Sequence, residues 1–253
     1  MMFFTNPLQR PCEPVAYRIK DMASEIISIQ VGLPRDHGAA EAVHPDDRLW
    51  TSGFYKDPIA GPVRVGRLHL DGDGQADLVN HGGIDKAICV YSADHYSYWR
   101  EQLALPLPYG AFGENFTVQN LTEADLCIGD TWQAGEVIVQ VSQPRQPCWK
   151  LARRWRVKTL ALQVQENGKT GWYFRVLQEG SIAAPISLKL LKRPFPEWTI
   201  ARANHLMHHD KGNALLAGEL AGVPLLSASW KATLSRRSAA QANPDPRLRL
   251  EGK

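Results

Sequence analysis

The stretch EVIVQVSQPRQPCWKLARRWRVK, residues 136–158, decides how the rest of the chain is interpreted. Its first part is rich in Val, as is typical of a strand. Pro144 and Pro147 then interrupt the pattern, and the basic residues that follow Cys148 predict a short helix. A strand, a proline-kinked loop and a basic helix with a cysteine at its start therefore follow one another directly.

Outward from this stretch, the chain is mainly β up to about residue 191. Short runs rich in Val and Ile, separated by Gly and Pro, predict strands over residues 25–31, 63–70, 87–91, 136–142 and 186–191. Two further helices are expected, one over residues 92–103 with Ser92 as N-cap, and one over residues 158–166. Many short strands with few helices favour a closed or nearly closed β-barrel over a βαβ sheet.

The composition changes after residue 192, where the pattern becomes helical. Residues 197–209, 213–222 and 227–240 predict three short helices, and Ser227 can cap the last of them. We expect four parts: a disordered N-terminal extension (1–23), a β-barrel domain (24–192), a three-helix domain (195–240) and a flexible tail (241–253). Because Met22 directly precedes the first strand, we consider it an alternative translation start to Met1.

Composition excludes several classes of protein. The chain has 253 residues, 44% of them hydrophobic, with a net charge of +3, which is ordinary for a globular protein and points to no particular charged partner. No apolar run approaches the roughly 18 residues of a membrane span. The N-terminus lacks the pattern of a secretion signal, so we expect a cytoplasmic protein with reduced thiols.

Familiar catalytic motifs are missing from the sequence. It contains no GxGxxG, phosphate loop, GxSxG or HExxH, and no CxxC pair. We interpret Cys12, Cys89 and Cys127 as structural or incidental. The spacing of His205, His208 and His209 would suit a metal on one helix face, but a solvated face explains it with fewer assumptions.

Cys148 is the candidate for chemistry. It stands among basic residues in a segment, residues 137–165, that contains no Asp or Glu. Cations and a helix N-terminus stabilise a thiolate, which is a nucleophile or a soft metal ligand. The alternative is a buried structural thiol beside a solvated basic helix. The cations also suit a phosphate-bearing small ligand, and because the charge is confined to one short segment we disfavour nucleic acid.

Taken together, the segments LVNHGGIDKAICVYS, GAFGENFTV, LCIGDTW and VSQPRQPCWKL resemble the MOSC-domain family (molybdenum cofactor sulfurase C-terminal domain), and more narrowly its bacterial YiiM group. The resemblance covers about residues 51–191, and the helices from Trp198 onward resemble that group's three-helix domain. It implies a β-barrel that binds a molybdopterin-type molybdenum cofactor, with Cys148 as the ligand to the metal. It also implies reduction of N-hydroxylated compounds, such as N-hydroxylated purine bases, to amines, with electrons from a separate flavin-containing reductase.

The resemblance also suggests which residues meet the cofactor. The glycines of the His81-Gly82-Gly83 segment would let the backbone approach a flat pterin, and the amide of Asn115 would bind the pterin edge; both segments could instead be ordinary turns. We expect the pterin phosphate to be bound by Arg145, Lys150 and Arg153, and Lys86 is a weaker candidate.

Two other functions remain open. One is a sulfur carrier or transferase that works through a Cys148 persulfide, and the other is a cofactor-binding module without turnover.

Overall fold

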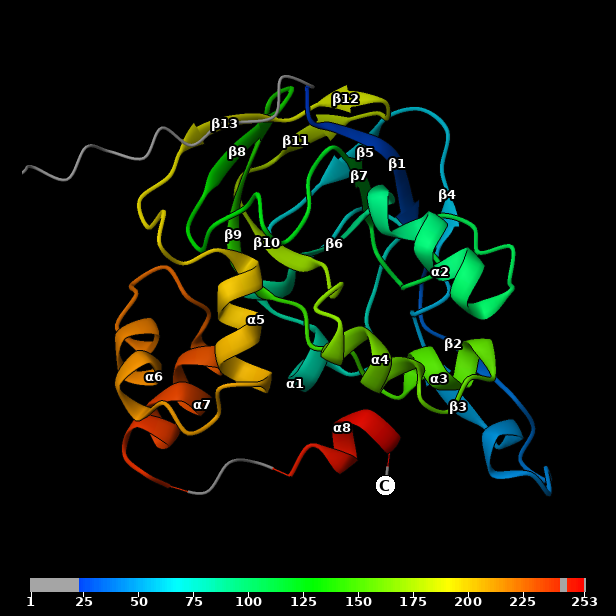
Figure 1. Cartoon of the computed structure of the whole chain (residues 1–253). Helices are drawn as coiled ribbons and strands as arrows, with labels where there is room; N and C mark the ends of the chain where they lie inside the picture. The colour runs from blue at the N-terminus through cyan, green and yellow to red at the C-terminus, as the bar shows by residue number, and fades with distance from the viewer. Residues whose placement is uncertain (1–22, 242–244, 253) are drawn as a thin grey trace, which may run out of the picture.

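The computed structural model describes residues 23–241 and 245–252, and most of its strands belong to one curled sheet (Figure 1). The strands of this sheet are β1 (Glu25–Val31), β4 (Asp57–Pro58), β6 (Ile88–Ser92), β7 (Phe116–Gln119), β8 (Thr131–Ala134), β9 (Val137–Pro144), β10 (Trp172–Gln178), β12 (Ile186–Ser187) and β13 (Lys189–Lys192). Two small sheets pair β2 (Arg35–His37) with β3 (Trp50–Ser52), and β5 (Val63–Val65) with β11 (Gly180–Ile182).

The large sheet curls back on itself through one short segment. Its order is β12-β1-β7-β6-β10-β9-β8-β13, so its first and last strands are β12 and β13, which only Leu188 separates in the chain. Ser187 pairs with Glu25 of β1, and Leu190 pairs with Trp132 of β8. The segment 186–192 therefore joins both edges of the sheet, and the prediction of a nearly closed barrel is confirmed.

The barrel interior is filled by the apolar residues that made these runs recognisable as strands. All five residues of β6 are buried, and Trp172 and Phe174 of β10 are fully buried. Pairing within the sheet is antiparallel except between β6 and β7, which run parallel. The same apolar core continues into the C-terminal helices through Trp198 and Ile200, so barrel and helices are packed together.

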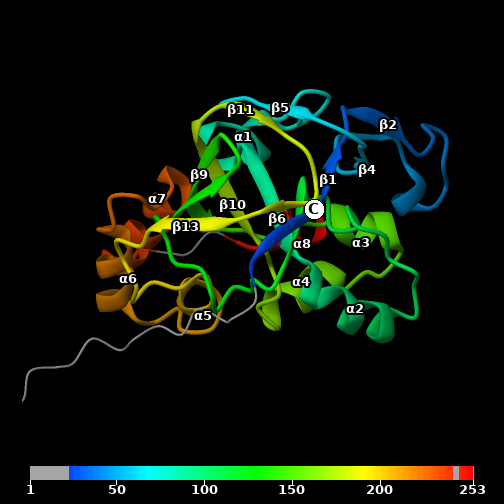
Figure 2. The ribbon, with the colours of Figure 1, turned by 90° about the horizontal axis from the view of Figure 1, so that it is seen from above.

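The helices lie on two sides of the barrel. Seen from above, α2–α4 cover one side, and α5–α7 are grouped on the other (Figure 2). The helices are α1 (Leu78–His81), α2 (Tyr96–Leu103), α3 (Lys150–Trp155), α4 (Leu160–Glu166), α5 (Ile200–His208), α6 (Ala214–Ala221), α7 (Ala228–Ser238) and α8 (Arg247–Glu251). Short 3-10 turns are η1 (Pro45–Asp47), η2 (Ile84–Lys86) and η3 (Ala93–His95). In the described part of the chain, no helix is long and apolar enough to cross a membrane.

The capping residues largely explain where helices begin. Ser92 accepts a hydrogen bond from the backbone N–H of Asp94, so it caps η3, which leads into α2. Ser227 accepts one from the N–H of Trp230 and caps α7, as its sequence predicted. The three predicted C-terminal helices are therefore present as α5, α6 and α7.

Three expectations need comment. The strand expected over residues 63–70 ends at Val65, because the chain turns at Gly66, whose N–H donates to the carbonyl of His69 at 3.0 Å. The tail expected to be flexible contains α8, which packs back against the barrel domain. The expectation for the N-terminal extension falls, up to residue 22, outside the described residues.

Candidate functional site

A cavity of about 570 Å³, counted with its solvent-open mouth, lies between the proline-kinked loop after β9 and the segments 52–56 and 74–76. Two thiols and four cations line it: Cys89, Cys148, Lys56, Lys86, Arg145 and Lys150. Among the described residues that line this cavity, none is an Asp or a Glu. The charge of this lining suits an anionic or electron-rich ligand.

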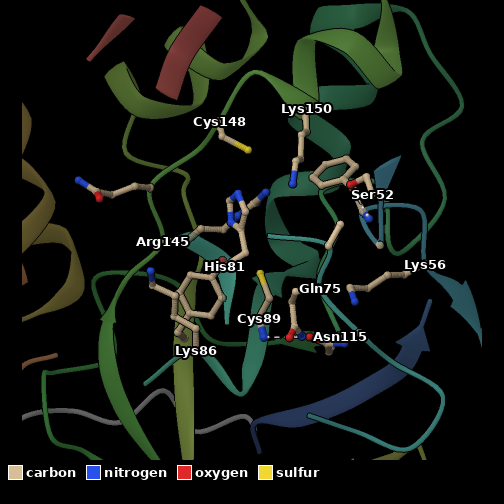
Figure 3. Close-up of a pocket in the computed structure, with 17 residues that line it drawn as sticks. Ser52, Lys56, Gln75, His81, Lys86, Cys89, Asn115, Arg145, Cys148 and Lys150 are labelled. Carbon is tan, nitrogen blue, oxygen red and sulfur yellow. Dashed lines mark hydrogen bonds between the residues drawn. The ribbon is translucent and has the colours of Figure 1, made fainter. Parts of the chain in front are cut away.

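Cys148 reaches this cavity from the loop before α3. Its side chain and that of Lys150 enter the space from one side, and Cys89 points in from the opposite side (Figure 3). Cys148 is 6% exposed. The helix begins at Lys150, two residues after Cys148, and has six residues. Arg145 and Lys150 line the same cavity, so the prediction of a cysteine beside cations holds.

Arg145 is the most constrained cation of the cavity. Its backbone N–H donates to the carbonyl of Gly171 at 3.0 Å, which fixes the residue just after β9. The side chain is 4% exposed, and its Nη1 has no hydrogen-bond partner among the described residues. Burial opposes the charge, but ionised Cys89, Tyr173 and Cys148 would favour it more strongly, so the pKa of Arg145 is raised. A buried guanidinium group with an unused donor is completed by an anion in the cavity.

His81 ends α1 and lines the cavity as a neutral ring. Burial, and then the nearby charge of Lys150, lower the pKa of His81 to about 3. The imidazole therefore offers one donor and one acceptor near neutral pH. Lys150 itself is buried, and the structure places both of these predicted residues at the cavity.

Lys86 and Lys56 are also brought to the cavity, but each has a partner in the protein. The Nζ of Lys86 donates to the carbonyl of Asn80 at 2.6 Å, and burial lowers the pKa of Lys86. Lys56 forms a buried ion pair with Asp73. Arg145 and Lys150 have no such carboxylate partner in the described chain, so they are the cations best placed to meet a ligand.

Asn115 lines the cavity with an amide that is already engaged. Its Oδ1 accepts from the backbone N–H of Cys89 at 3.0 Å, and its Nδ2 donates to the carbonyl of Gln30 at 3.3 Å. The side chain is 2% exposed. Asn115 thus links β6 to β1 at the cavity wall, and its binding to a pterin edge stays a prediction.

The two glycines after His81 do not line the cavity. Gly83 has a φ of +92°, and a Cβ added there would meet nothing within 4 Å. The positive φ is by itself a reason for glycine at this turn. The expectation that Gly82 and Gly83 sit against a cofactor is not reproduced by the geometry.

Arg153 does not line the cavity and is bonded elsewhere, which corrects its assignment to a phosphate. Its Nε donates to the carbonyl of Asp46 at 3.0 Å, and its Nη2 donates to the carbonyl of Arg48. The guanidinium also lies over the rings of Trp50 and Trp149, at 5.2 and 5.5 Å from their centroids. Arg153 fastens α3 to the segment around β3.

The sequence did not reveal that Cys89, interpreted above as structural or incidental, lines the cavity. This residue pairs across strands with Tyr173 of β10, and both side chains line the cavity. Burial raises the pKa of Cys89 and of Tyr173, so both side chains keep their protons. No local signal marks Cys89, because its position at the cavity depends on pairing between strands far apart in the sequence.

The other cysteines and the histidine cluster lie elsewhere. The Sγ of Cys127 donates to the carbonyl of Pro196 at 3.4 Å, in keeping with a structural thiol, and Cys12 lies outside the described residues. His205 and His209 are exposed and stack with centroids 5.5 Å apart. The helix face that carries these histidines is only partly solvated, because His208 is half-buried. This burial lowers the pKa of His208 to about 3.

The chain matches the family model of the MOSC domain over residues 77–185, which include strands β6 to β10 of the curled sheet and the cavity residues Arg145 and Cys148. A second model, described as the YiiM-like, 3-alpha helix domain, matches residues 198–240. The chain belongs to the YiiM-like family of MOSC-domain proteins.

Relatives of known sequence and structure agree with this assignment. The chain is 42% identical to the uncharacterized protein YflK of Bacillus subtilis, over 87% of this chain and 96% of that protein. It is 35% identical to the protein YiiM of Escherichia coli, over 80% and 91% of the two chains. The crystal structure of YiiM from Geobacillus stearothermophilus is 42% identical and superposes with a TM-score of 0.71, over 85% of this chain and 98% of that one.

A longer relative carries a functional name. A protein of Gibberella moniliformis called "Reductase" is 34% identical over 69% of this chain, which corresponds to 32% of that protein. The match is therefore to one part of a larger protein.

Proposed function

We propose that the cavity binds a molybdopterin-type molybdenum cofactor, and that the protein reduces N-hydroxylated compounds, such as N-hydroxylated purine bases, to amines. Membership of the MOSC family and the relative named Reductase support an enzyme of this kind. The observation that carries the proposal is the buried Nη1 of Arg145, which has no partner in the described chain and lies beside Cys148 at the cavity.

The residues of the cavity fit this cofactor. A thiol such as that of Cys148 is a soft ligand that suits molybdenum held by dithiolene sulfurs. Arg145 and Lys150 supply donors and positive charge for the phosphate of the pterin. The neutral ring of His81 can exchange hydrogen bonds with a heterocycle. When bound, the cofactor would supply the two-electron chemistry of the reaction.

The protein's own contribution is to hold the ligands and to deliver protons. The reaction R–NHOH + 2e⁻ + 2H⁺ → R–NH₂ + H₂O consumes two protons for each substrate. Because burial lowers the pKa of Lys86, its ammonium gives up a proton more readily than an exposed lysine would. We assign proton delivery to Lys86. Cys89 and Tyr173 stay protonated and keep the cavity wall free of opposing negative charge.

We propose a separate flavin-containing reductase as the source of electrons. It must approach the solvent-open side of the cavity, where the half-buried His81 and Lys86 lie. The cytoplasm, where such reductases and reduced thiols are found, is the compartment that we propose for the protein.

Metal analysis of purified protein tests the proposal. We expect near-stoichiometric molybdenum by elemental mass spectrometry, with pterin fluorescence in the same sample, when the protein is made in a host that synthesises the cofactor. Cys148→Ala should lose the reduction of N-hydroxylated purines and keep the fold, since a single side chain of the cavity wall is all that changes. The matched control is Cys127→Ala, which removes a buried thiol away from the cavity and should keep both.

One result of the metal analysis would contradict the proposed function. If the wild-type protein takes up no molybdenum even after incubation with free cofactor, the proposal is wrong. Sulfur transfer through a Cys148 persulfide, or binding of another anion without turnover, would then be the functions to examine.

A further inference from the structure

The C-terminal helix α8 lies next to the loop that carries Cys148, rather than with the helices that precede it in the chain. It runs from Arg247 to Glu251, beyond residue 240, where the match to the three-helix domain ends. Figure 1 shows α8 beneath the barrel near α4, separate from α6 and α7. The structure thus places against the loop of Cys148 an element that the family match does not include.

One residue of α8 bonds to both peptide groups that flank Cys148. The Nη1 of Arg249 donates to the carbonyl of Pro147, which belongs to the peptide before Cys148. The backbone carbonyl of Arg249 accepts from the N–H of Trp149 at 2.8 Å, which belongs to the peptide after Cys148. These two bonds restrict the rotation of both peptide planes, and the direction of the Cys148 side chain follows from those planes.

Arg249 is itself held in place from the barrel side. Its Nη2 donates to Oε1 of Gln165 on α4 at 2.6 Å. At the end of α8, Gly252 has a φ of +73°, and a Cβ added there would lie 3.0 Å from Cγ of Trp149.

We infer that Arg249 is a positioning residue for Cys148, and that the C-terminal tail completes the site which the barrel begins. The inference rests on the proposed function, because it assigns Arg249 a part in presenting the metal ligand. Arg249 does not line the cavity, so it acts on Cys148 through the backbone of the loop that carries it.

The alkylation rate of Cys148 in the full-length, cofactor-free protein tests this directly. Monobromobimane is added, and peptide mass spectrometry follows Cys148 with Cys127 as the internal reference. Loss of one charge-assisted hydrogen bond beside a buried thiol should make Cys148 react roughly tenfold faster in Arg249→Ala. Gly252→Val should act in the same way, because its side chain collides with Trp149 and displaces α8.

Two further variants separate positioning from general stability. Arg249→Lys keeps the charge and one donor, so it should restore part of the slow wild-type rate. Arg247→Ala removes an exposed arginine of the same helix that pairs with Asp245, and it should leave the rate unchanged. A wild-type rate at Cys148 in both Arg249→Ala and Gly252→Val overturns the inference, as does an equal acceleration at Cys127.

The loaded protein supplies an independent second measurement. Arg249→Ala should retain several-fold less molybdenum than the wild type after gel filtration, with Arg247→Ala as the control. If the wild type binds no molybdenum, the proposed function fails. The alkylation rates still decide whether α8 positions Cys148, because they do not depend on the cofactor.

Discussion

The basic segment after β9 has two halves, residues 145–150 and residues 153–156, which carry the same charge but make different contacts. In the first half, Arg145 and Lys150 are buried at a cavity whose described lining contains no carboxylate. In the second half, each arginine is engaged by another part of the protein. Arg153 bonds to the carbonyls of residues 46 and 48, Arg154 donates to the carbonyl of Gly110 at 2.7 Å, and Arg156 pairs with Asp47. The two halves differ in whether distant segments of the protein provide hydrogen-bond acceptors for the cations. They do so for the arginines of the second half, whereas the Nη1 of Arg145 has no such acceptor among the described residues.

The first way to break this comparison is Arg145→Met, which should have the largest effect. Hydrogen bonds to charged groups contribute roughly 1.5–3 kcal/mol, so cofactor affinity should fall by about a hundredfold. The fold should not suffer, because replacing a buried and incompletely paired charge by an apolar side chain is often neutral or stabilising. Titration with free molybdopterin, followed by its fluorescence, and thermal unfolding measure the two effects.

The matched control is Lys192→Met, which removes an exposed lysine from β13, a strand that does not line the cavity. Its affinity should equal that of the wild type. Unchanged affinity in Arg145→Met, together with a lower melting temperature, would show that Arg145 belongs to the structural half.

Much of the fold could be predicted from the sequence because its signals are local. Runs of Val and Ile mark β1, β6 and β9, and a capping residue such as Ser227 marks the start of a helix. The closure of the sheet follows from contacts between residues 25 and 187, which no local pattern contains. The gross architecture is therefore readable, whereas the register is not.

The site was only partly predictable for the same reason. Cys148, Arg145 and Lys150 stand close together in the chain, and the structure keeps them together at the cavity. Cys89 reaches the cavity through its pairing with Tyr173, and Arg249 reaches Cys148 through a helix at the far end of the chain. Contacts between distant segments decided these two cases, so composition and spacing could not reveal them.

The second prediction concerns the structural half. Arg153→Ala removes hydrogen bonds to backbone carbonyls and the contacts with two tryptophan rings, so the free energy of unfolding should fall by about 2 kcal/mol. Cofactor affinity should stay within about twofold of the wild type, because Arg153 does not line the cavity. Urea unfolding and the fluorescence titration measure these quantities.

Arg153→Ala is expected to lower stability and leave cofactor affinity unchanged, the opposite of what is expected for Arg145→Met. If Arg153→Ala instead loses the cofactor at unchanged stability, the division of the basic segment proposed above is wrong. Arg153→Lys, which keeps the charge but not the planar group over the rings, tells the two contributions apart.

The third prediction, with the smallest effect, concerns the stability of the protein at acid pH and the histidine that lines the cavity. The pKa of His81 is about 3 in the folded protein, lowered by burial and by Lys150, against about 6.5 for an unperturbed histidine. Between these values the unfolded chain binds more protons than the folded one, so stability rises with pH and is lost as the pH falls below about 6.5. Replacing His81 by Gln removes this proton uptake and should flatten the loss by about 1 kcal/mol at pH 5.5.

The pH dependence of stability is compared between the wild type and His81→Gln. His208 also has a pKa lowered to about 3, so it contributes the same acid sensitivity to both proteins. Urea unfolding at pH 7.5 and 5.5 gives the four free energies that are needed. Phosphate at high concentration should reduce the acid loss of the wild type, since an anion between Arg145 and Lys150 screens the charges that oppose protonation of His81. Equal pH dependence in the wild type and in His81→Gln would mean that the ring is solvated and that the cations of the cavity do not act on it.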